Sequence, residues 1–330
     1  MSLSLFRKGL LVVAVAGLLA SVGAYAGTRG GSGAHEKAPP QQQPAPAPSQ
    51  PAGPVSIASG SAQRSFVSAN HGNDANPCTV TLPCRNFAAA IAQTAAGGEV
   101  IVLDSGGYGP VTIGSSISLI SPPGVYAGIT AFSGDAITIT AGASDVVTLR
   151  GLTLNGLGGD RGVDFQAGGA LYVEQLTIKN FASFGIYVFP SGSALVRVED
   201  TTVTRSGNVG IFLGTSTGGV TVKATIVDSR FEDDVNGVIA DNQSQVAVQN
   251  SVATGNTGVG FYASAGDLSL DGCVSSHNNY GLYSSGTVRS SSTLIVKNNV
   301  GVFGNVISWG NNRLAGNTTD GSFSSTIGLQ

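Results

Sequence analysis

A short glycine-centred motif repeats along most of the chain, and it constrains the fold more than any other feature of the sequence. Each copy places a glycine before an apolar residue, as in Asn208-Val209-Gly210-Ile211. The glycines of the seven copies are Gly162, Gly185, Gly210, Gly237, Gly258, Gly281 and Gly301. They are 20 to 27 residues apart, with a mean near 23. A second short apolar segment lies about ten residues before each glycine, so each repeat predicts two or three short strands.

The length of the repeat excludes the common repeat folds. A propeller blade needs about 40 residues, and the helical repeats need about 33–34. Charged residues are only 11% of the chain and glycine is 48 of its 330 residues, which disfavours long surface helices. A leucine-rich repeat fits the length, but its leucine–asparagine framework is missing. The remaining fold is an all-β parallel β-helix, a solenoid of roughly nine coils between about residues 100 and 310.

In such a solenoid, equivalent residues of successive coils stack about 4.8 Å apart. Apolar rows are expected inside, and amide ladders are expected at the asparagine-rich turns between Asn278 and Asn317. The terminal coils expose unpaired edges, so both ends need caps. Residues 86–96 have an apolar helical face that ends at Gly97-Gly98, which predicts a short N-terminal capping helix. The other end is expected to be covered by Phe323, Ile327 and Leu329.

The first 62 residues indicate export. Residues 1–26 have the parts of a secretory signal peptide: a short basic region, an apolar run of about 14 residues and Ala24-Tyr25-Ala26 before the expected cleavage point. The run is short for a membrane span of about 20 residues, so cleavage is favoured over an uncleaved anchor and no transmembrane span is expected afterwards. Residues 27–62 are rich in Pro, Gln and Ala and predict a disordered linker. Residues 63–330 are expected to form the β-helix domain in the periplasm, at the cell surface or outside the cell.

The three cysteines agree with an exported address. Cys78 and Cys84 are close in the sequence and are expected to form a local disulfide in an oxidising compartment. Their spacing does not fit a zinc site. Cys273 lies at an apolar-patterned position, which predicts a buried free thiol rather than a nucleophile.

Three pieces of sequence precede or open the repeats: Gly72-Asn73-Asp74-Ala75-Asn76-Pro77, the apolar helical segment that follows Asn86, and Val100-Ile101-Val102 with Gly107-Tyr108. Together they resemble the opening segment of right-handed parallel β-helix proteins of the pectate-lyase-like superfamily. The resemblance covers about residues 66–320 and implies a right-handed solenoid with an N-terminal capping helix. Members include polysaccharide lyases, hydrolases, epimerases, adhesins and proteins of no known activity, so the fold does not settle the function. The motifs of polygalacturonases and mannuronan epimerases, and the calcium-binding aspartates of pectate lyases, are not found in this sequence.

Stacking of the repeats predicts one concentration of charge. When the turns after the second apolar segment are aligned, Lys179, Arg205 and Glu232-Asp233-Asp234 lie on three adjacent coils. A β-elimination lyase needs a Lys or Arg base and neutralisation of the sugar carboxylate, often by Ca²⁺ held by acids. A glycosidase instead needs two carboxylates at a set separation. These five residues are the candidate catalytic residues, with Ca²⁺ as a candidate cofactor. The alternative is a solvated turn with weak ion pairs.

Two other rows bear on function. Gly151, Gln175, Asp200, Asp228, Gln249 and Asp271 form a row that is expected to hydrogen-bond the turn backbone. Aromatic residues follow the repeated glycines, namely Tyr187, Phe212, Phe261, Tyr262, Tyr280, Tyr283 and Phe303. Because side chains alternate along a strand, about half of these rings at most are expected to be exposed. Exposed rings would favour sugar binding, whereas a flat Ser/Thr/Asn face would favour a structural role.

Two classes of function follow from the sequence. The first is an exported protein that binds or acts on a polysaccharide or cell-envelope glycan along its flank. If it is an enzyme, which the sequence leaves open, a polysaccharide lyase or glycoside hydrolase is expected. The second is a non-catalytic structural or adhesive protein of the cell surface or envelope. The net charge of −3 argues against nucleic acid as a partner, and a monomer is expected.

Overall fold

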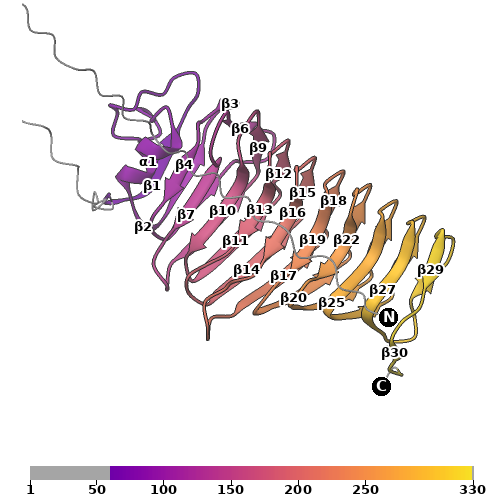
Figure 1. Cartoon of the computed structure of the whole chain (residues 1–330). Helices are drawn as coiled ribbons and strands as arrows, with labels where there is room; N and C mark the ends of the chain where they lie inside the picture. Colours follow the sequence, from indigo (N-terminus) through magenta and orange to yellow (C-terminus); the bar gives the residue numbers. More distant parts are fainter. Residues whose placement is uncertain (1–59, 329–330) are drawn as a thin grey trace, which may run out of the picture. The chain divides into compact units, whose positions relative to one another are not determined.

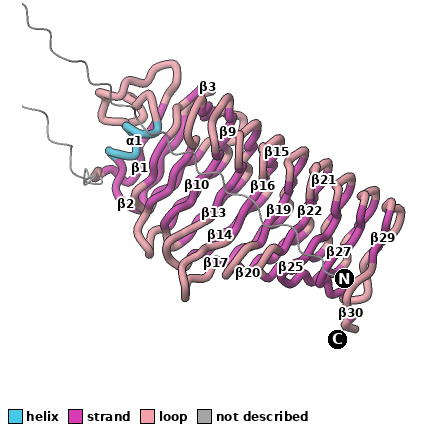
Figure 2. Tube along the Cα trace, in the orientation of Figure 1, coloured by secondary structure: helices cyan, strands magenta, loops and turns pink. Residues whose placement is uncertain are grey.

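The computed structural model describes residues 60–328, which wind into a parallel β-helix (Figure 1). Strands form the coils, and a helix lies at the N-terminal end of the solenoid (Figure 2). One of its sheets has ten strands, one per coil, which is close to the predicted number of coils. The predicted signal peptide and all but the last three residues of the predicted linker lie outside the described residues. Within residues 60–328, no helix is long and apolar enough to cross a membrane.

Three ladders of parallel strands form the three flanks of the solenoid. The flank called aromatic below contains β4 (Val111–Ile113), β7 (Ile137–Thr140), β10 (Arg161–Ala167), β13 (Phe184–Val188), β16 (Val209–Leu213), β19 (Asn236–Ala240), β22 (Val259–Ala263), the first halves of β25 (Tyr280–Ser291) and β27 (Val300–Ser308), and β29 (Thr319–Gly321).

The flank called polar below contains β1 (Ala62–Val67), β2 (Thr94–Val102), β5 (Ile117–Ile120), β8 (Val146–Arg150), β11 (Ala170–Glu174), β14 (Ala194–Glu199), β17 (Val222–Val227), β20 (Ser244–Gln249), β23 (Asp267–Asp271), the second halves of β25 and β27, and β30 (Ser325–Thr326). The third flank contains β3 (Gly106–Gly107), β6 (Ala127–Ala131), β9 (Leu152–Gly156), β12 (Thr177–Lys179), β15 (Thr202–Thr204), β18 (Arg230–Glu232), β21 (Val252–Thr254), β24 (Val274–Ser276), β26 (Leu294–Val296) and β28 (Arg313–Leu314).

The core is made of apolar rows that run along the solenoid. Side chains alternate along each strand, so Ile186 and Val188 of β13 are buried while Tyr187 between them faces outward. The register of the aromatic flank continues the row through Ile137, Val163, Ile186, Ile211, Val238, Phe261, Leu282 and Val302. All eight are buried, and each such side chain contributes about 1.5–3 kcal/mol of transfer free energy.

One glycine per coil stacks on the next, and the structure corrects one member of the predicted row. In the register of β19 and β22, Gly237 lies beside Gly260 and not beside Gly258. A Cβ on Gly260 would lie 2.9 Å from the carbonyl oxygen of Gly281, closer than real side chains come. The sequence offers two glycines two residues apart in this coil, which is why spacing alone selected the wrong one.

The N-terminal cap is present but shorter than predicted. Helix α1 (Phe87–Gln93) replaces the expected 86–96, because Thr94 begins β2 and pairs with β1. The Thr94 hydroxyl donates to the carbonyl oxygen of Ala90 at 2.7 Å and so satisfies a carbonyl group of the last helical turn. Strand pairing therefore begins where another helical turn was expected. The predicted disulfide between Cys78 and Cys84 is confirmed, in the loop before the helix.

The C-terminal cap is smaller. Phe323 packs partly against the core as expected, whereas Ile327 is exposed. Leu329 lies outside the described residues. The last coil therefore buries little apolar surface of its own.

An amide ladder stabilises the corner between the third flank and the aromatic flank, as the asparagine-rich turns predict. Asn256, Asn278 and Asn298 each donate from Nδ2 to the Oδ1 of the next asparagine at 2.9–3.1 Å, and the last acceptor is Asn317. Their backbone N–H groups donate to the same oxygens. Asn317 donates instead to Asp320 of its own coil, so this carboxylate ends the ladder.

Asp234 occupies a position in the same row, one coil before Asn256. Its side chain is 1% exposed, and its Oδ1 accepts from the backbone N–H of Ser206 at 2.6 Å. Its Oδ2 has no hydrogen-bond partner. Burial, opposed by the hydrogen bonds from Ser206, raises the pKa of this carboxyl to about 7. Asp234 therefore faces the interior, although the sequence analysis treats it as an accessible acid.

Cys273 is a buried free thiol, as predicted, and the fold gives it a place in a second row. Thr201, Ser229 and Ser251 lie at the same corner of earlier coils, and each hydroxyl donates to the carbonyl oxygen two residues before it. The Cys273 thiol contacts the equivalent carbonyl, that of Asp271, at 3.4 Å. Cys273 thus takes the place of a serine or threonine in a row of inward hydroxyls.

We predict that Asp234→Asn stabilises the protein, and more so at high pH. The unfolded carboxyl releases its proton near its usual pKa of 3.8, whereas the folded one keeps its proton up to about 7. The carboxyl therefore lowers the free energy of unfolding progressively as pH rises between these values, by about 4 kcal/mol at most. An asparagine removes this dependence and can donate as its neighbours do. Urea unfolding at about pH 5 and pH 8 should show a gain of about 2–4 kcal/mol that is larger at pH 8. Equal gains at both pH values would contradict a raised pKa.

We also predict that Cys273→Ser changes the free energy of unfolding by less than about 1 kcal/mol, because serine makes the row's own hydrogen bond. Cys273→Val, which keeps the volume but removes the donor, should cost about 1–3 kcal/mol. Burial raises the pKa of the Cys273 thiol to about 11, so thiol reagents should label it only after unfolding. Rapid labelling of the native protein would show that the thiol is accessible.

Candidate functional site

The five charged residues selected from the sequence lie on three successive coils, but they do not share a pocket. Lys179 and Glu232 end β12 and β18, with Thr204 between them in register. Arg205 and Asp233 occupy the next position, a turn residue with left-handed backbone (φ 57° in both). The predicted alignment is thus correct for these coils. It is one residue out at Ala253 and Ser275, whose stacked positions belong to Thr254 and Ser276.

The contacts of these residues are local. Arg205 Nε donates to Asn180 Oδ1 at 2.8 Å, and Glu232 pairs with Arg230 at 2.7 Å. Asp234 points into the amide ladder and not toward the other four. None of the five lines any of the hollows described below. This corner has the geometry of a solvated turn.

The aromatic flank carries most of the rings that follow the repeated glycines. One outward row in register runs through Tyr187, Phe212, Ile239, Tyr262, Tyr283 and Phe303. Of the seven rings considered in the sequence, Phe261 is buried in the core, Phe303 is exposed and the other five are half-buried, which agrees with the expectation that about half at most would be exposed. The residue two places after each stacked glycine belongs to this outward row, and it is aromatic in every coil except those of Gly162 and Gly237, where it is Asp164 and Ile239.

These rings form two clusters. Tyr187 and Phe212 stack at 5.3 Å between ring centroids, with Phe184 and Phe189 beside them. Tyr283 and Phe303 stack at 5.3 Å, with Tyr262 and Tyr280 beside them. The coil of β19 separates the clusters, because it places Ile239 in the row. Phe303, at the end of the second cluster, is 52% exposed.

A group of charged side chains lies at the N-terminal end of the aromatic row. Asp164 precedes Tyr187 in the row, and Thr138 and Thr112 precede Asp164. The Asp164 side chain is 1% exposed, and its Oδ2 accepts from Arg161 at 2.9 Å and from Gln166 at 2.6 Å. The Arg161 guanidinium also lies 4.4 Å from the centroid of the Tyr187 ring, a cation–π contact.

Asp135 belongs to the same group. It lies within hydrogen-bonding reach of Asp164, and burial together with the charge of Asp164 raises its pKa to about 6, against the opposing effect of Arg161. Asp135 also lines a hollow of about 430 Å³ between the aromatic flank and α1. The remaining lining residues are Ala88, Ile91, Ala92, Pro110, Val111, Thr112 and Thr138.

This group was not predicted from the sequence. Its members come from two coils, and their motif, Arg161-Gly162-Val163, is the weakest copy of the repeat. Extending the coil alignment one repeat toward the N-terminus would have placed Asp135 beside Arg161. The coil alignment is therefore the feature of the sequence from which this group could have been predicted.

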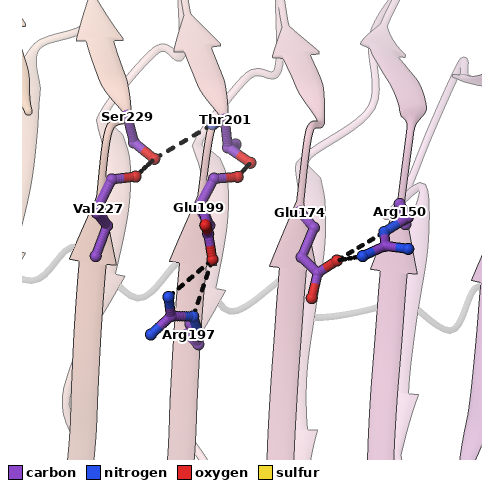
Figure 3. A network of polar contacts seen from close by, with 7 residues as sticks. All are labelled: Arg150, Glu174, Arg197, Glu199, Thr201, Val227 and Ser229. Carbon is purple, nitrogen blue, oxygen red and sulfur yellow. Dashed lines mark hydrogen bonds and ion pairs between the residues drawn. The ribbon is translucent and has the colours of Figure 1, made fainter. Parts of the chain in front are cut away.

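The polar flank carries a network of ion pairs and hydrogen bonds (Figure 3), and hollows of its own lie on it. Arg150 pairs with Glu174 of the next coil at 2.6 Å, and Arg197 pairs with Glu199 of its own strand at 2.9 Å. A hollow of about 480 Å³ lies over β14, β17, β20 and β23, with Lys223 among its lining residues.

A second hollow on this flank, of about 410 Å³, is lined by Arg150, Glu174, Gln175, Glu199, Asp200 and Asp228. Gln175, Asp200 and Asp228 belong to the second row of the sequence analysis, and all three have left-handed backbone. The row continues through Asn250 and Gly272, not through Gln249 and Asp271 as predicted. Among residues 60–328, no group of three or more His, Cys, Asp and Glu side chains is arranged to hold a metal ion.

Comparison with known proteins agrees with this architecture. A family model described as "Right handed beta helix region" matches residues 161–319. No curated protein sequence matches the chain. A solved structure of XylC in complex with xylose is 10% identical, covers 76% of this chain and 70% of its own, and superposes with a TM-score of 0.52.

Two further solved structures are similar. The pectate lyase Pel9A is 14% identical, with 82% of this chain and 80% of its own covered and a TM-score of 0.49. A GH136 lacto-N-biosidase from Eubacterium ramulus is 11% identical, with 81% and 67% covered and a TM-score of 0.49. At these identities the likeness concerns the fold alone. The chain is a right-handed parallel β-helix protein, as its opening segment implied.

Proposed function

We propose that this right-handed β-helix protein is exported and binds a neutral polysaccharide along its aromatic flank. The observation that carries the proposal is the outward row of rings from Tyr187 to Phe303, in register over successive coils. Rings that are half-buried at their base offer a large apolar contact area with little loss of side-chain freedom.

The geometry of the row suits a linear polymer. Successive coils are about 4.8 Å apart, close to the length of one sugar unit in an extended glycan. A chain that lies along the solenoid axis can therefore repeat the same contact from coil to coil. The two clusters provide two such stretches, separated by the coil that carries Ile239.

The charge of this flank favours a neutral glycan. Asp135, Asp164 and Asp241 lie on it or at its edge, and Arg161 is already paired with Asp164. An excess of carboxylates repels a polyuronate, whereas a neutral polysaccharide meets no such cost. Binding of an acidic polysaccharide at the corner of Lys179 and Arg205 is the competing possibility, and the experiment below tests it as well.

Export is supported by the signal-peptide pattern of residues 1–26 and by the Cys78–Cys84 disulfide, which suits an oxidising compartment. The protein would then bind its glycan in the periplasm, at the cell surface or outside the cell. The alternative function is a structural or adhesive envelope protein. The stacking of Tyr283 on Phe303, with ring planes 12° apart, favours that alternative, because such pairs stabilise the solenoid by about 0.5–1.5 kcal/mol without any ligand.

We predict that replacing Tyr262, Tyr283 and Phe303 together by Ser weakens binding to xylan or a neutral β-glucan at least tenfold, a loss of about 1.4 kcal/mol or more. Tyr172→Ser is the matched control, because Tyr172 faces outward on the polar flank and should leave binding unchanged. Binding is measured by calorimetry, with thermal unfolding to show that each variant is folded.

Three results would contradict this proposal. If the triple variant binds as the wild type does, the rings are not the site. If the double variant Lys179→Ala/Arg205→Ala alone loses binding, and polygalacturonate is the preferred ligand, the site is the charged corner. A wild type that binds none of these polysaccharides would favour the structural alternative.

A further inference from the structure

We propose that Asp135 is a proton donor for cleavage of a glycosidic bond in the hollow beside α1, and that Asp164 is the positioning residue that holds it. This rests on the proposed binding of a neutral glycan to the aromatic flank. Beyond binding, it assigns hydrolysis of the glycan to the hollow at the N-terminal end of that flank.

The outward row of the aromatic flank is continuous with the hollow beside α1. The outward row of rings leads through Tyr187 to Asp164, and then to Thr138 and Thr112. Both threonines line the hollow of about 430 Å³, together with Asp135. A glycan that lies along the rings is therefore led into this hollow, where it meets one carboxyl group and two hydroxyl groups.

One buried oxygen of Asp164 has no hydrogen-bond donor. The Asp164 carboxylate is buried, and Arg161 and Gln166 donate to its Oδ2, while its Oδ1 has no donor. Asp135 lies within hydrogen-bonding reach of Asp164. A proton on Asp135 would supply the missing donor to this oxygen. A buried acceptor without a donor costs about 1–3 kcal/mol, which favours this arrangement.

The surroundings of Asp135 favour its protonated form. Burial raises its pKa most, the charges of Asp164 and Asp160 raise it further, and Arg161 lowers it. The helix on the other side of the hollow contributes only Ala88, Ile91 and Ala92, which carry no charge. A carboxyl with a pKa of about 6 is a proton donor suited to mildly acidic conditions.

The chemical step balances with water as the only co-reactant. The proton of Asp135 goes to the glycosidic oxygen while the bond from that oxygen to the anomeric carbon breaks, and the bonding electrons stay on the oxygen. Water adds to the anomeric carbon, and the proton that it releases returns to Asp135 through solvent, which restores the acid. Asp164 is not the second catalytic carboxylate, because acid and nucleophile or base must be about 5 Å or more apart, and Asp164 is within hydrogen-bonding reach of Asp135.

The test measures reducing ends released from xylan, neutral β-glucan and mannan, from about pH 4 to pH 8, with wild-type binding to each polymer measured in parallel. Asp135→Asn should lower the rate by about 10²-fold or more. Asp228→Asn, which removes an acid from the polar flank, is the control and should leave the rate unchanged.

The variant Asp164→Asn tests whether Asp164 acts on Asp135 or only stabilises the fold. Removing the charge of Asp164 should lower the pKa of Asp135, so the fall in rate with rising pH moves to lower pH. An unshifted profile overturns the role of Asp164, and wild-type rates in a folded Asp135→Asn variant overturn that of Asp135. If the wild type binds these polymers but cleaves none of them, this inference fails while the proposed function stands. If it does not bind them, the proposed function fails as well.

Discussion

The in-register pairing of successive coils is the interaction on which the rest of this structure depends. Parallel backbone hydrogen bonds fix equivalent residues about 4.8 Å apart, so any property of one position is repeated along a row. Inward rows become apolar ladders, and two corner rows become ladders of amides and hydroxyls that satisfy the turn backbone. A single substitution in such a row has a defined meaning, because its neighbours show what the position requires. Asp234 among asparagines and Cys273 among hydroxyls are examples.

The same pairing builds the candidate site from residues that are far apart in the sequence. Outward positions of the aromatic flank form a track of rings, and its first members are Asp164 and two threonines instead of rings. The flank therefore has two parts along its length. One part is an apolar surface suited to binding a polymer, and the other is a polar end with a hollow that α1 lines on one side. The polar flank instead carries ion pairs on its surface, such as Arg150 with Glu174 and Arg197 with Glu199 (Figure 3).

The sequence predicted the elements that repeat and missed those that depend on a single register step. The coil period, the Cys78–Cys84 disulfide, the buried Cys273 and the asparagine ladder all follow from periodicity or local spacing. Gly260 was missed because Gly258 fits the spacing as well, and the helix was overextended because strand pairing at Thr94 is a tertiary contact. The inward direction of Asp234 and the meeting of Asp135 with Asp164 depend on which way a corner residue points, and composition and spacing carry no such information.

A crystal structure with a bound neutral oligosaccharide, such as one derived from xylan or β-glucan, tests the central claim most directly. The account predicts sugar rings over Tyr262, Tyr283 and Phe303 or over Tyr187 and Phe212, with the chain running along the solenoid axis. A sugar bound instead in the polar-flank hollow around Lys223, or at the corner of Lys179 and Arg205, would contradict it.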